Sequence, residues 1–372
     1  MPTQIKQVAE AIEKIAPLGL AQDWDNVGLL VGDENKNIKN ILITIDVTAA
    51  VVKEAKKLKT DLILSYHPII WDGLKTVTTK TETAHIVELI RSKISVFSIH
   101  TAFDVAAGGV NDQLAEIVGI ENPKPIGDYV ASPEGNYFKI VTFVPVDSIN
   151  DVAEAILGAG AGAVGNYSKC SFQTPGTGTF LPMQGAKPAI GKKGKLEKVN
   201  EIKLESIVPE SKVAAVIEAM RKAHPYETPA FDVFQHYDLE GKLGLGRIGD
   251  LKKPRSMATI IENIKKVTGA KAVGIVGKER RTVKKAAVCA GSCGKLINSV
   301  IADNCDLYLT GELKHHQALA AQEANLTCIC LSHTVSERFA LKKLAKSLKN
   351  HLKNVTIRLS KKDADPFKWK NI

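Results

Sequence analysis

The fold can be predicted from one stretch of the sequence, Val96-Phe97-Ser98-Ile99-His100-Thr101-Ala102-Phe103-Asp104. Its first four residues have the apolar character of a short buried strand, and a histidine and an aspartate follow at the carboxyl end. Open α/β sheets gather their ligands at the carboxyl ends of their strands. The stretch therefore predicts a strand that delivers His100 and Asp104 to a functional site.

Two other stretches have the same design. Leu62 to Ser65 is an apolar run that leads into Tyr66-His67-Pro68. Thr327 to Leu331 leads into Ser332-His333, and Glu337 follows four residues later, on the same face of a helix. Three predicted strand ends therefore supply five candidate ligands, which are His67, His100, Asp104, His333 and Glu337.

Strands and helices alternate in both flanks of the chain. In the first flank, strands are expected at 41–47, 62–65 and 95–99, and helices at 3–16, 49–58, 83–92 and 111–118, with Thr3, Thr48 and Asn111 as N-caps and Gly119 as a stop. In the second flank, strands are expected at 272–276, 285–289, 307–310 and 327–331, and helices at 257–268, 295–302 and 312–323. This alternation predicts an α/β core with a mostly parallel sheet.

Between the flanks the order of elements changes. The pattern predicts strands at 137–146, 166–173, 199–207 and 230–235, and helices at 149–157 and 211–223. Their order, β-α-β-β-α-β, is that of a ferredoxin-like α+β unit. We therefore expect a domain of residues 130–240, inserted into a discontinuous metal-binding core of residues 1–129 and 241–372.

Charge, cysteine usage and hydropathy exclude several classes of protein. The 372 residues carry a net charge of +10, but no aromatic residues are interleaved with the basic clusters, so nucleic-acid binding is only weakly supported. The six cysteines form no CxxC pair, which argues against a zinc ribbon. The first residues form an amphipathic pattern and no apolar run approaches the length of a membrane span, so a soluble, cytoplasmic protein without membrane contact is expected.

Imidazole and carboxylate ligands without thiolate suit divalent Zn, Fe, Mn, Co or Ni. Five such groups exceed what one catalytic zinc needs, and two ions held by carboxylates can activate water for hydrolysis. The alternative is that each histidine is a hydrogen-bonded core residue. A second polar group contains Glu312 and His316, which on one helix could serve as catalytic proton carriers or support the ligands; alternatively, they are ordinary surface residues near a helix start.

Three glycine-containing motifs are interpreted as backbone turns. Gly160 to Gly165 and Gly244 to Gly249 match GxGxxG but lack the strand, the helix and the later acidic residue of a dinucleotide site. Gly291-Ser292-Cys293-Gly294 lacks the flanking pattern of a nucleophile elbow. It predicts a tight strand-to-helix turn whose amides are open to an anion.

With these residues placed, the chain resembles the NIF-three-like family, also known as GTP cyclohydrolase I type 2 homologues. The resemblance rests on motifs in the right order along the chain, namely Trp24 to Gly32, Ser65 to Pro68, His100 to Asp104, Thr310 to Glu312 with His315-His316, and Ser332-His333 with Ser336-Glu337. It implies two metal ions on His67, His100, Asp104, His333 and Glu337, and a ring-shaped homohexamer. Through Gln173 to Phe180 and His224 to Ala230, the inserted segment resembles the CutA and PII proteins.

Tyr66 departs from the pattern of many bacterial members, which have histidine at that position. A phenol is a poor ligand at neutral pH unless a metal lowers its pKa. Three functions are therefore weighed: a metal-dependent hydrolase acting on a nucleotide, phosphate ester or cyclic amide, a non-enzymatic metal-binding scaffold or adaptor ring, and a basic ring that holds nucleic acid. The excess of ligands favours the hydrolase.

Overall fold

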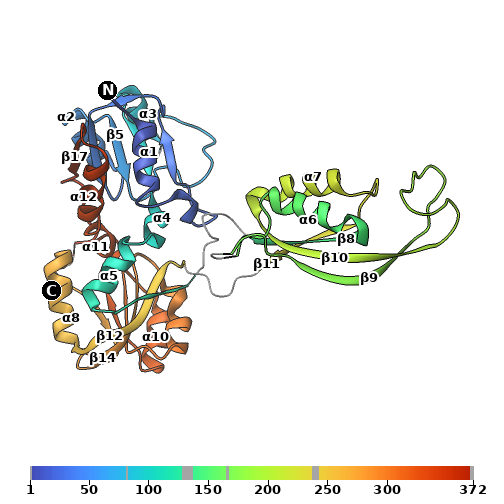
Figure 1. Ribbon diagram of the computed structural model, residues 1–372. Helices are drawn as coiled ribbons and strands as arrows, with labels where there is room; N and C mark the ends of the chain where they lie inside the picture. The colour runs from blue at the N-terminus through green and yellow to red at the C-terminus, as the bar shows by residue number, and fades with distance from the viewer. Residues whose placement is uncertain (1, 81–82, 128–136, 165–166, 237–242, 369–372) are drawn as a thin grey trace. The chain divides into compact units, whose positions relative to one another are not determined.

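The computed structural model describes residues 2–80, 83–127, 137–164, 167–236 and 243–368. These residues form two compact units, one built from both flanks of the chain and the other from residues 137–236 (Figure 1). The domain boundaries predicted near residues 130 and 240 lie outside the described residues. Within the described ranges, no helix is both long and apolar enough to cross a bilayer.

The first unit contains a five-stranded sheet in the order β17-β4-β5-β6-β2. Its strands are β2 (Gly28–Val31), β4 (Asn40–Thr44), β5 (Leu62–Ser65), β6 (Ser95–Ser98) and β17 (Thr356–Leu359). β17, β4, β5 and β6 run parallel, whereas β2 is antiparallel to β6. The helices of this half are α1 (Ile5–Glu13), α2 (Ala49–Lys57), α3 (Ala84–Arg91) and α12 (Leu341–His351), and a short ribbon pairs β1 (Thr3–Gln4) with β3 (Asn37–Ile38).

A six-stranded sheet in the order β13-β16-β15-β14-β12-β7 forms the other half of this unit. Its strands are β7 (Lys124–Ile126), β12 (Gly246–Ser256), β13 (Gly274–Val276), β14 (Thr282–Cys289), β15 (Leu307–Thr310) and β16 (Thr327–Cys330). Its helices are α8 (Met257–Thr268), α9 (Ile297–Ala302) and α10 (His315–Glu323). Only β14, β15 and β16 run parallel, so the single mostly parallel sheet predicted from the sequence is corrected to two partly parallel sheets.

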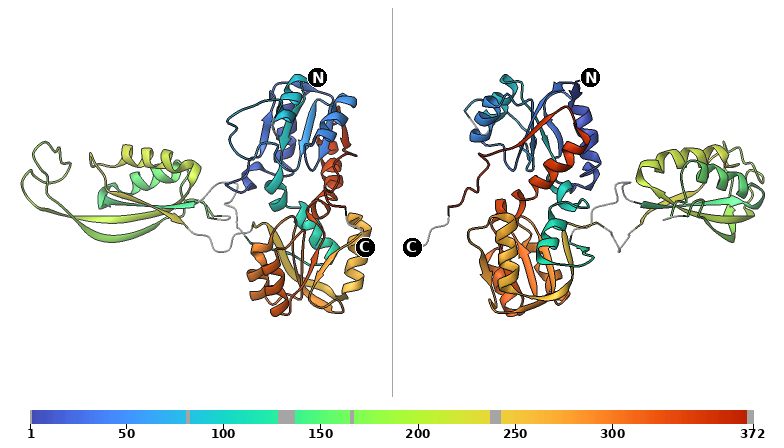
Figure 2. Two further views of the ribbon diagram at one scale, coloured as in Figure 1. Left: turned by 180° about the vertical axis from the view of Figure 1, so that it is seen from behind. Right: turned by 60° about the vertical axis from the view of Figure 1, so that its left-hand side comes forward.

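The two flanks of the chain are interlocked. β7 comes from the first flank but pairs with β12, and β17 comes from the second flank but pairs with β4. One hydrophobic cluster accordingly includes core residues of both sheets. Figure 2 shows α4 (His100–Val105), α5 (Val110–Val118) and α11 (His333–Arg338), in teal and red, where the two halves of this unit meet.

Several predicted boundaries are wrong for identifiable reasons. Thr3 pairs in β1, so the first helix begins at Ile5. Gly109 is the N-cap of α5, and Asn111 is instead buried inside that helix, although Gly119 does end it in a left-handed conformation. Thr48 is confirmed as the cap of α2, because its hydroxyl accepts a hydrogen bond from the amide of Val51.

The glycine run near residue 246 is part of a strand rather than a turn. A Cβ atom at Gly246 would lie 2.7 Å from the carbonyl oxygen of Val288 on β14. Glycine therefore allows β12 to pack closely against its neighbour at a position that any side chain would obstruct.

The second unit is a four-stranded antiparallel sheet in the order β11-β8-β10-β9. Its elements are β8 (Tyr137–Pro145), α6 (Ile149–Gly158), β9 (Phe172–Phe180), β10 (Glu197–Pro209), α7 (Val213–Ala223) and β11 (Phe231–His236), in the predicted β-α-β-β-α-β order. Residue 166 of the strand predicted at 166–173 lies outside the described residues, and the strand found there, β9, begins only at Phe172 and contains Pro175 and two glycines. As the edge strand, β9 can tolerate these residues.

Candidate metal centre

The three histidines lie where strands of the two sheets end. His67 follows β5, His100 begins α4 after β6, and His333 begins α11 after β16. The ring centroid of His67 lies 5.1 Å from that of His100 and 5.3 Å from that of His333. Residues from both flanks thus meet at one place, as the three strand-end motifs predict.

The tightest cluster consists of His67, His333 and Glu337, whose candidate ligand atoms all lie within 4.8 Å of one another. Nε2 of His333 is 3.1 Å from Oε1 of Glu337, and Nε2 of His67 is 3.4 Å from Oε2. Oε2 is buried, and because the approach of His67 does not have hydrogen-bond geometry, this oxygen has no hydrogen-bond partner. A buried carboxylate oxygen without a donor is costly, and a cation is a suitable partner for it.

Each histidine is held by a carboxylate on the side facing away from this cluster. Nδ1 of His67 lies 2.8 Å from Asp46, Nδ1 of His100 lies 2.8 Å from Asp25, and Nδ1 of His333 lies 2.8 Å from Glu312. When Nδ1 carries the proton and donates it to a carboxylate, the lone pair of Nε2 is free to bind a metal. This arrangement is what metal-binding histidines require, so the residues present fit the ions that the sequence implies.

The charges of the cluster are strongly coupled. Burial opposes ionisation of Glu337, but contacts with His333 and His67 lower its pKa to about 2. The contact with Glu337, acting against burial, raises the pKa of His333 to about 9. Burial of His67 is likewise outweighed by Asp46 and Glu337, which raise its pKa to about 10. Protons therefore balance the buried carboxylate, and a metal ion would have to displace them.

Asp104, also predicted as a ligand, accepts a hydrogen bond from the hydroxyl of Tyr66. Burial and the nearby charge of Glu337 raise the pKa of Asp104 to about 8. Tyr66 is fully buried, and burial together with Asp104 raises its pKa well above the usual value, so the phenol is neutral. Tyr66 therefore acts on the site as a hydrogen-bond donor to Asp104.

Glu312 and His316 do not share a helix, because α10 begins only at His315. Glu312 lies ahead of that helix and contacts His333, whereas His316 is exposed and its ring contacts that of His315. The shared helix predicted for this pair is therefore corrected, whereas a role in proton transfer stays a prediction. Glu312 supports a candidate ligand, and His316 makes no contact with the cluster among those found in the described residues.

Gly291 provides room beside the cluster. It has a left-handed backbone, with a φ angle of 68°, and an added Cβ atom would lie 2.7 Å from Oε1 of Glu337. Its amide donates to the hydroxyl of Ser336 at 2.9 Å. The predicted strand-to-helix turn is present, but this amide is occupied and is not open to an anion.

Two tryptophans border the histidines. The ring centroid of Trp24 lies 5.8 Å from that of His100, and the ring centroid of Trp71 lies 5.2 Å from it. Their exposed fractions are 59% and 51%, which is unusual for such large apolar rings. The loops that carry them are joined by the amide of Asn26, which donates to the carbonyl of Ile70 at 2.7 Å.

Sequence reasoning missed Asp25 and Asp46 as partners of histidines, and Trp71 at the border of the site. Asp46 lies at the end of the strand predicted at 41–47, and Asp25 stands in the Trp24 to Gly32 motif, but neither pattern identifies the histidine that the residue contacts. Asp25 is 75 positions from His100. Only the folded chain pairs them.

Replacing Asp46 by Asn should weaken zinc binding roughly 10–100-fold, because loss of the carboxylate frees the orientation of the His67 ring and lowers its basicity. A competition titration with a chromophoric chelator measures this change. Asp33→Asn, at an exposed loop carboxylate, is the matched control and should bind as the parent protein does. Equal affinity for all three proteins would show that His67 does not bind the ion.

The chain is similar over nearly its whole length to a known protein family and to solved structures. The family model described as Duf34/NIF3 (NGG1p interacting factor 3) matches residues 3–366. A Bacillus subtilis protein named GTP cyclohydrolase 1 type 2 homolog is 35% identical over 366 residues, which cover 97% of each chain. The structure of a Bacillus cereus protein related to NIF3 has a TM-score of 0.69 at 35% identity, covering all of both chains. That of Staphylococcus aureus protein SA1388 has a TM-score of 0.77 at 25% identity, covering 99% of both chains.

Proposed function

Because the chain belongs to the Duf34/NIF3 family, we propose that it is a metal-dependent hydrolase of small molecules that contain a planar ring. The observation that carries this proposal is the cluster of His67, His333 and Glu337. Two of its members are histidines held at Nδ1 by carboxylates, and the third has a buried oxygen without a hydrogen-bond donor. Such a site is built to hold a cation.

Two divalent ions, chosen from Zn, Fe, Mn, Co and Ni, are proposed. His67, His333 and Glu337 would hold one ion, and His100 and Asp104, which adjoin them, would complete the set for a second. Bound ions would supply Lewis acidity for hydrolysis. Asp25, Asp46 and Glu312 orient the imidazoles, and Tyr66 fixes Asp104. Glu312 is therefore proposed to be a positioning residue rather than a proton carrier.

Trp24 and Trp71 are the reason for proposing that the substrate contains a planar ring. Half-exposed indole rings beside a polar site offer stacking surfaces, and stacking of a base on an aromatic side chain contributes about 1–3 kcal/mol. The hydrogen bond from Asn26 to Ile70 holds the two loops together, so the surfaces exist before a ligand binds. The name of the relatives, GTP cyclohydrolase 1 type 2 homolog, also points to a purine nucleotide as a candidate.

Trp71→Ala should weaken binding of GMP to the metal-loaded protein about tenfold, since one stacking surface is lost. Quenching of intrinsic fluorescence can follow binding, because the chain has three tryptophans and two of them border the site. Trp71→Phe keeps an aromatic face and should remain close to the parent protein. If ribose 5-phosphate binds as tightly as GMP, the ring is not what the site recognises.

Hydrolysis itself is tested by metal analysis of protein purified without chelator, followed by a screen of nucleotides, phosphate esters and cyclic amides with the metal-loaded protein. We expect up to two ions per chain and metal-dependent turnover of a ring-containing compound. Full metal occupancy without turnover of any class would favour a non-enzymatic scaffold. Occupancy below one ion per chain would reject the metal centre.

The second unit is proposed to be an autonomous CutA/PII-like domain, supported by its β-α-β-β-α-β order and its separate hydrophobic cluster. Replacing residues 130–240 by a short Gly/Ser linker should leave a folded core with the parent's metal content, because every candidate ligand lies in the first unit. Loss of metal from a well-folded deletion would show that the second unit contributes to the site. The homohexameric ring stays a prediction, which sedimentation velocity would test.

A further inference from the structure

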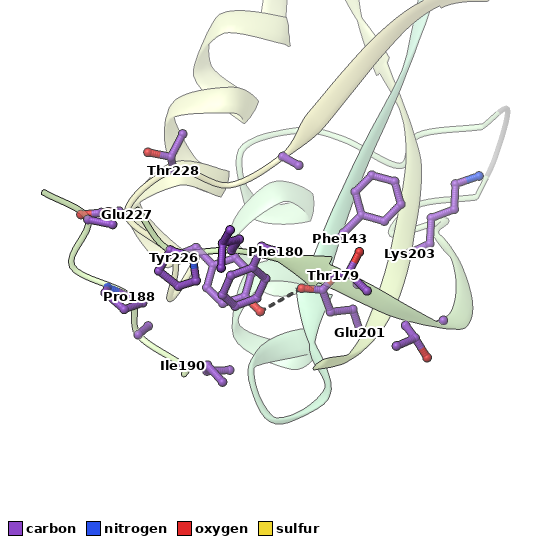
Figure 3. Close-up of a pocket in the computed structure, with 18 of the residues that line it drawn as sticks. Phe143, Thr179, Phe180, Pro188, Ile190, Glu201, Lys203, Tyr226, Glu227 and Thr228 are labelled. Carbon is purple, nitrogen blue, oxygen red and sulfur yellow. Dashed lines mark hydrogen bonds between the residues drawn. The ribbon is translucent and has the colours of Figure 1, made fainter. Parts of the chain in front are cut away.

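The second unit contains a cavity of about 820 Å³ (Figure 3). Its apolar walls include Phe143, Phe180, Met183 and Ile190. Along β8, the neighbour of Phe143, Val144, packs with α6 and α7 in the hydrophobic cluster of this unit. Because successive side chains of a strand point to opposite faces, the cavity lies on the face of the sheet that faces away from these helices. Its size and apolar lining are typical of small-molecule sites.

One carboxylate stands in this apolar surrounding. Glu201 on β10 is only 8% exposed, and its Oε1 accepts a hydrogen bond from the hydroxyl of Tyr226 at 2.8 Å, drawn as a dashed line in Figure 3. Its Oε2 lies over Gly178 of β9, where an added Cβ atom would stand 2.1 Å away. Glycine at this position is what allows the carboxylate to lie where it does.

The partners of the carboxylate are fixed in place. His224 contacts the carbonyl of Phe143 through Nε2 at 2.9 Å, and its Nδ1 accepts from the amide of Tyr226 at 3.1 Å. The ring of Tyr226 also packs on Phe180, with centroids 5.6 Å apart. The loop after β9 is held over the cavity because the amide of Lys187 donates to Glu227 at 3.0 Å.

The charge of Glu201 is not balanced by a cation. None of the ion pairs found among the described residues includes it, and the one lysine that lines the cavity, Lys203, is paired with Glu205 at 2.5 Å. Glu227, a second lining carboxylate, adds negative charge. A buried carboxylate with one hydroxyl partner has lone pairs left for further donors.

We propose that this cavity is a binding site for a small flat compound with an apolar body and a cationic amine or amidine group, which would contact Glu201. The apolar walls would cover the body of the ligand, and the carboxylate would accept its N–H groups. A fork of two N–H donors matches a carboxylate in a bidentate manner. The site is separate from the candidate metal centre and belongs to the other unit.

Benzamidine is the probe, and calorimetry on the full chain is the measurement. We expect benzamidine to bind, its neutral analogue benzamide to bind at least tenfold more weakly, and benzoate not to bind. Glu201→Gln should reduce benzamidine affinity at least tenfold, because the charge is lost. Glu218→Gln, at an exposed position on α7, should leave it unchanged.

Two glycines of β9 provide a matched pair that separates displacement of the carboxylate from damage to the strand. Gly178→Ala would push Oε2 of Glu201 aside and should abolish binding, whereas the nearest atom to a Cβ at Gly176 is 4.0 Å away, so Gly176→Ala should bind normally. Equal affinities for benzamidine and benzoate, no binding by the parent protein, or equal loss in both glycine variants would each overturn the proposal. So would self-association that Glu201→Gln abolishes, since the occupant would then be a second copy of the chain.

Discussion

Glu337→Gln should abolish metal binding, with the affinity for the metal lowered roughly 100-fold or more. This loss is larger than the one expected for Asp46→Asn, because Asp46 only contacts a candidate ligand whereas Glu337 is one. Glutamine has nearly the same shape as glutamate, but it replaces one oxygen by an N–H donor and removes the charge. Oε1 lies 3.1 Å from Nε2 of His333 and Oε2 lies 3.4 Å from Nε2 of His67, so each oxygen adjoins a nitrogen that would bind the ion. Metal content per chain measures the result directly.

Thermal unfolding offers a second measurement of the same change. An ion that binds only the folded chain raises the melting temperature by mass action, so added zinc should stabilise the parent protein and not the Glu337→Gln variant. Glu116→Gln, at an exposed position of α5, is the control and should respond to zinc like the parent. Unchanged metal content in Glu337→Gln would show that the metal is not bound by Glu337 of α11.

Asn111→Ala should lower the free energy of unfolding by about 3 kcal/mol, since it leaves two buried backbone groups unpaired at about 1–3 kcal/mol each. Asn111 is fully buried, donates to the carbonyl of Leu245 at 2.6 Å and accepts from the amide of Ala290 at 2.7 Å. Urea denaturation measures the change. One side chain thus joins the first flank to two segments of the second.

Asn350→Ala is the control for this substitution, because Asn350 is exposed on α12 and its loss should change stability little. The two variants remove the same side chain from a buried and from a solvated place. A change below about 1 kcal/mol in Asn111→Ala would mean that water replaces the lost amide, and the hydrogen bonds would not be what holds the flanks together.

The sequence predicted the strands and the candidate ligands at their ends better than it predicted how these strands are arranged in sheets. The strands at Leu62–Ser65 and Leu307–Thr310 have the expected bounds, because buried parallel strands are short apolar runs. The five candidate ligands follow from what stands at such strand ends. Their grouping at one place was expected as well, but on a single sheet, whereas His67 and His333 follow strands of two different sheets.

The predictions that were wrong also failed because they depend on contacts between residues that are distant along the chain. The spacing of Glu312 and His316 predicts one helix face, but Glu312 lies ahead of α10, where it contacts His333. Asn111 resembles a helix cap in sequence, whereas its three hydrogen-bond partners are distant along the chain or outside the helix ladder. The glycines of β12 were predicted to form a turn, and the strand predicted at 166–173 ends before Pro175 of β9, because local propensity does not report which strands are edges or which approach closely.

β7 and β17 each pair with a strand from the other flank of the chain, and this pairing affects how the chain folds during synthesis. β4 emerges early from the ribosome, but its neighbour β17 is made almost last, so the first sheet cannot be completed until nearly the whole chain is available. The second unit is contiguous, and as the autonomous domain proposed above it would fold before the first flank can be completed. Until then the parallel edge of β4 is open to wrong partners. Truncation even a few residues before Leu359 should therefore yield nascent chains that need a chaperone, although the metal cluster lies upstream.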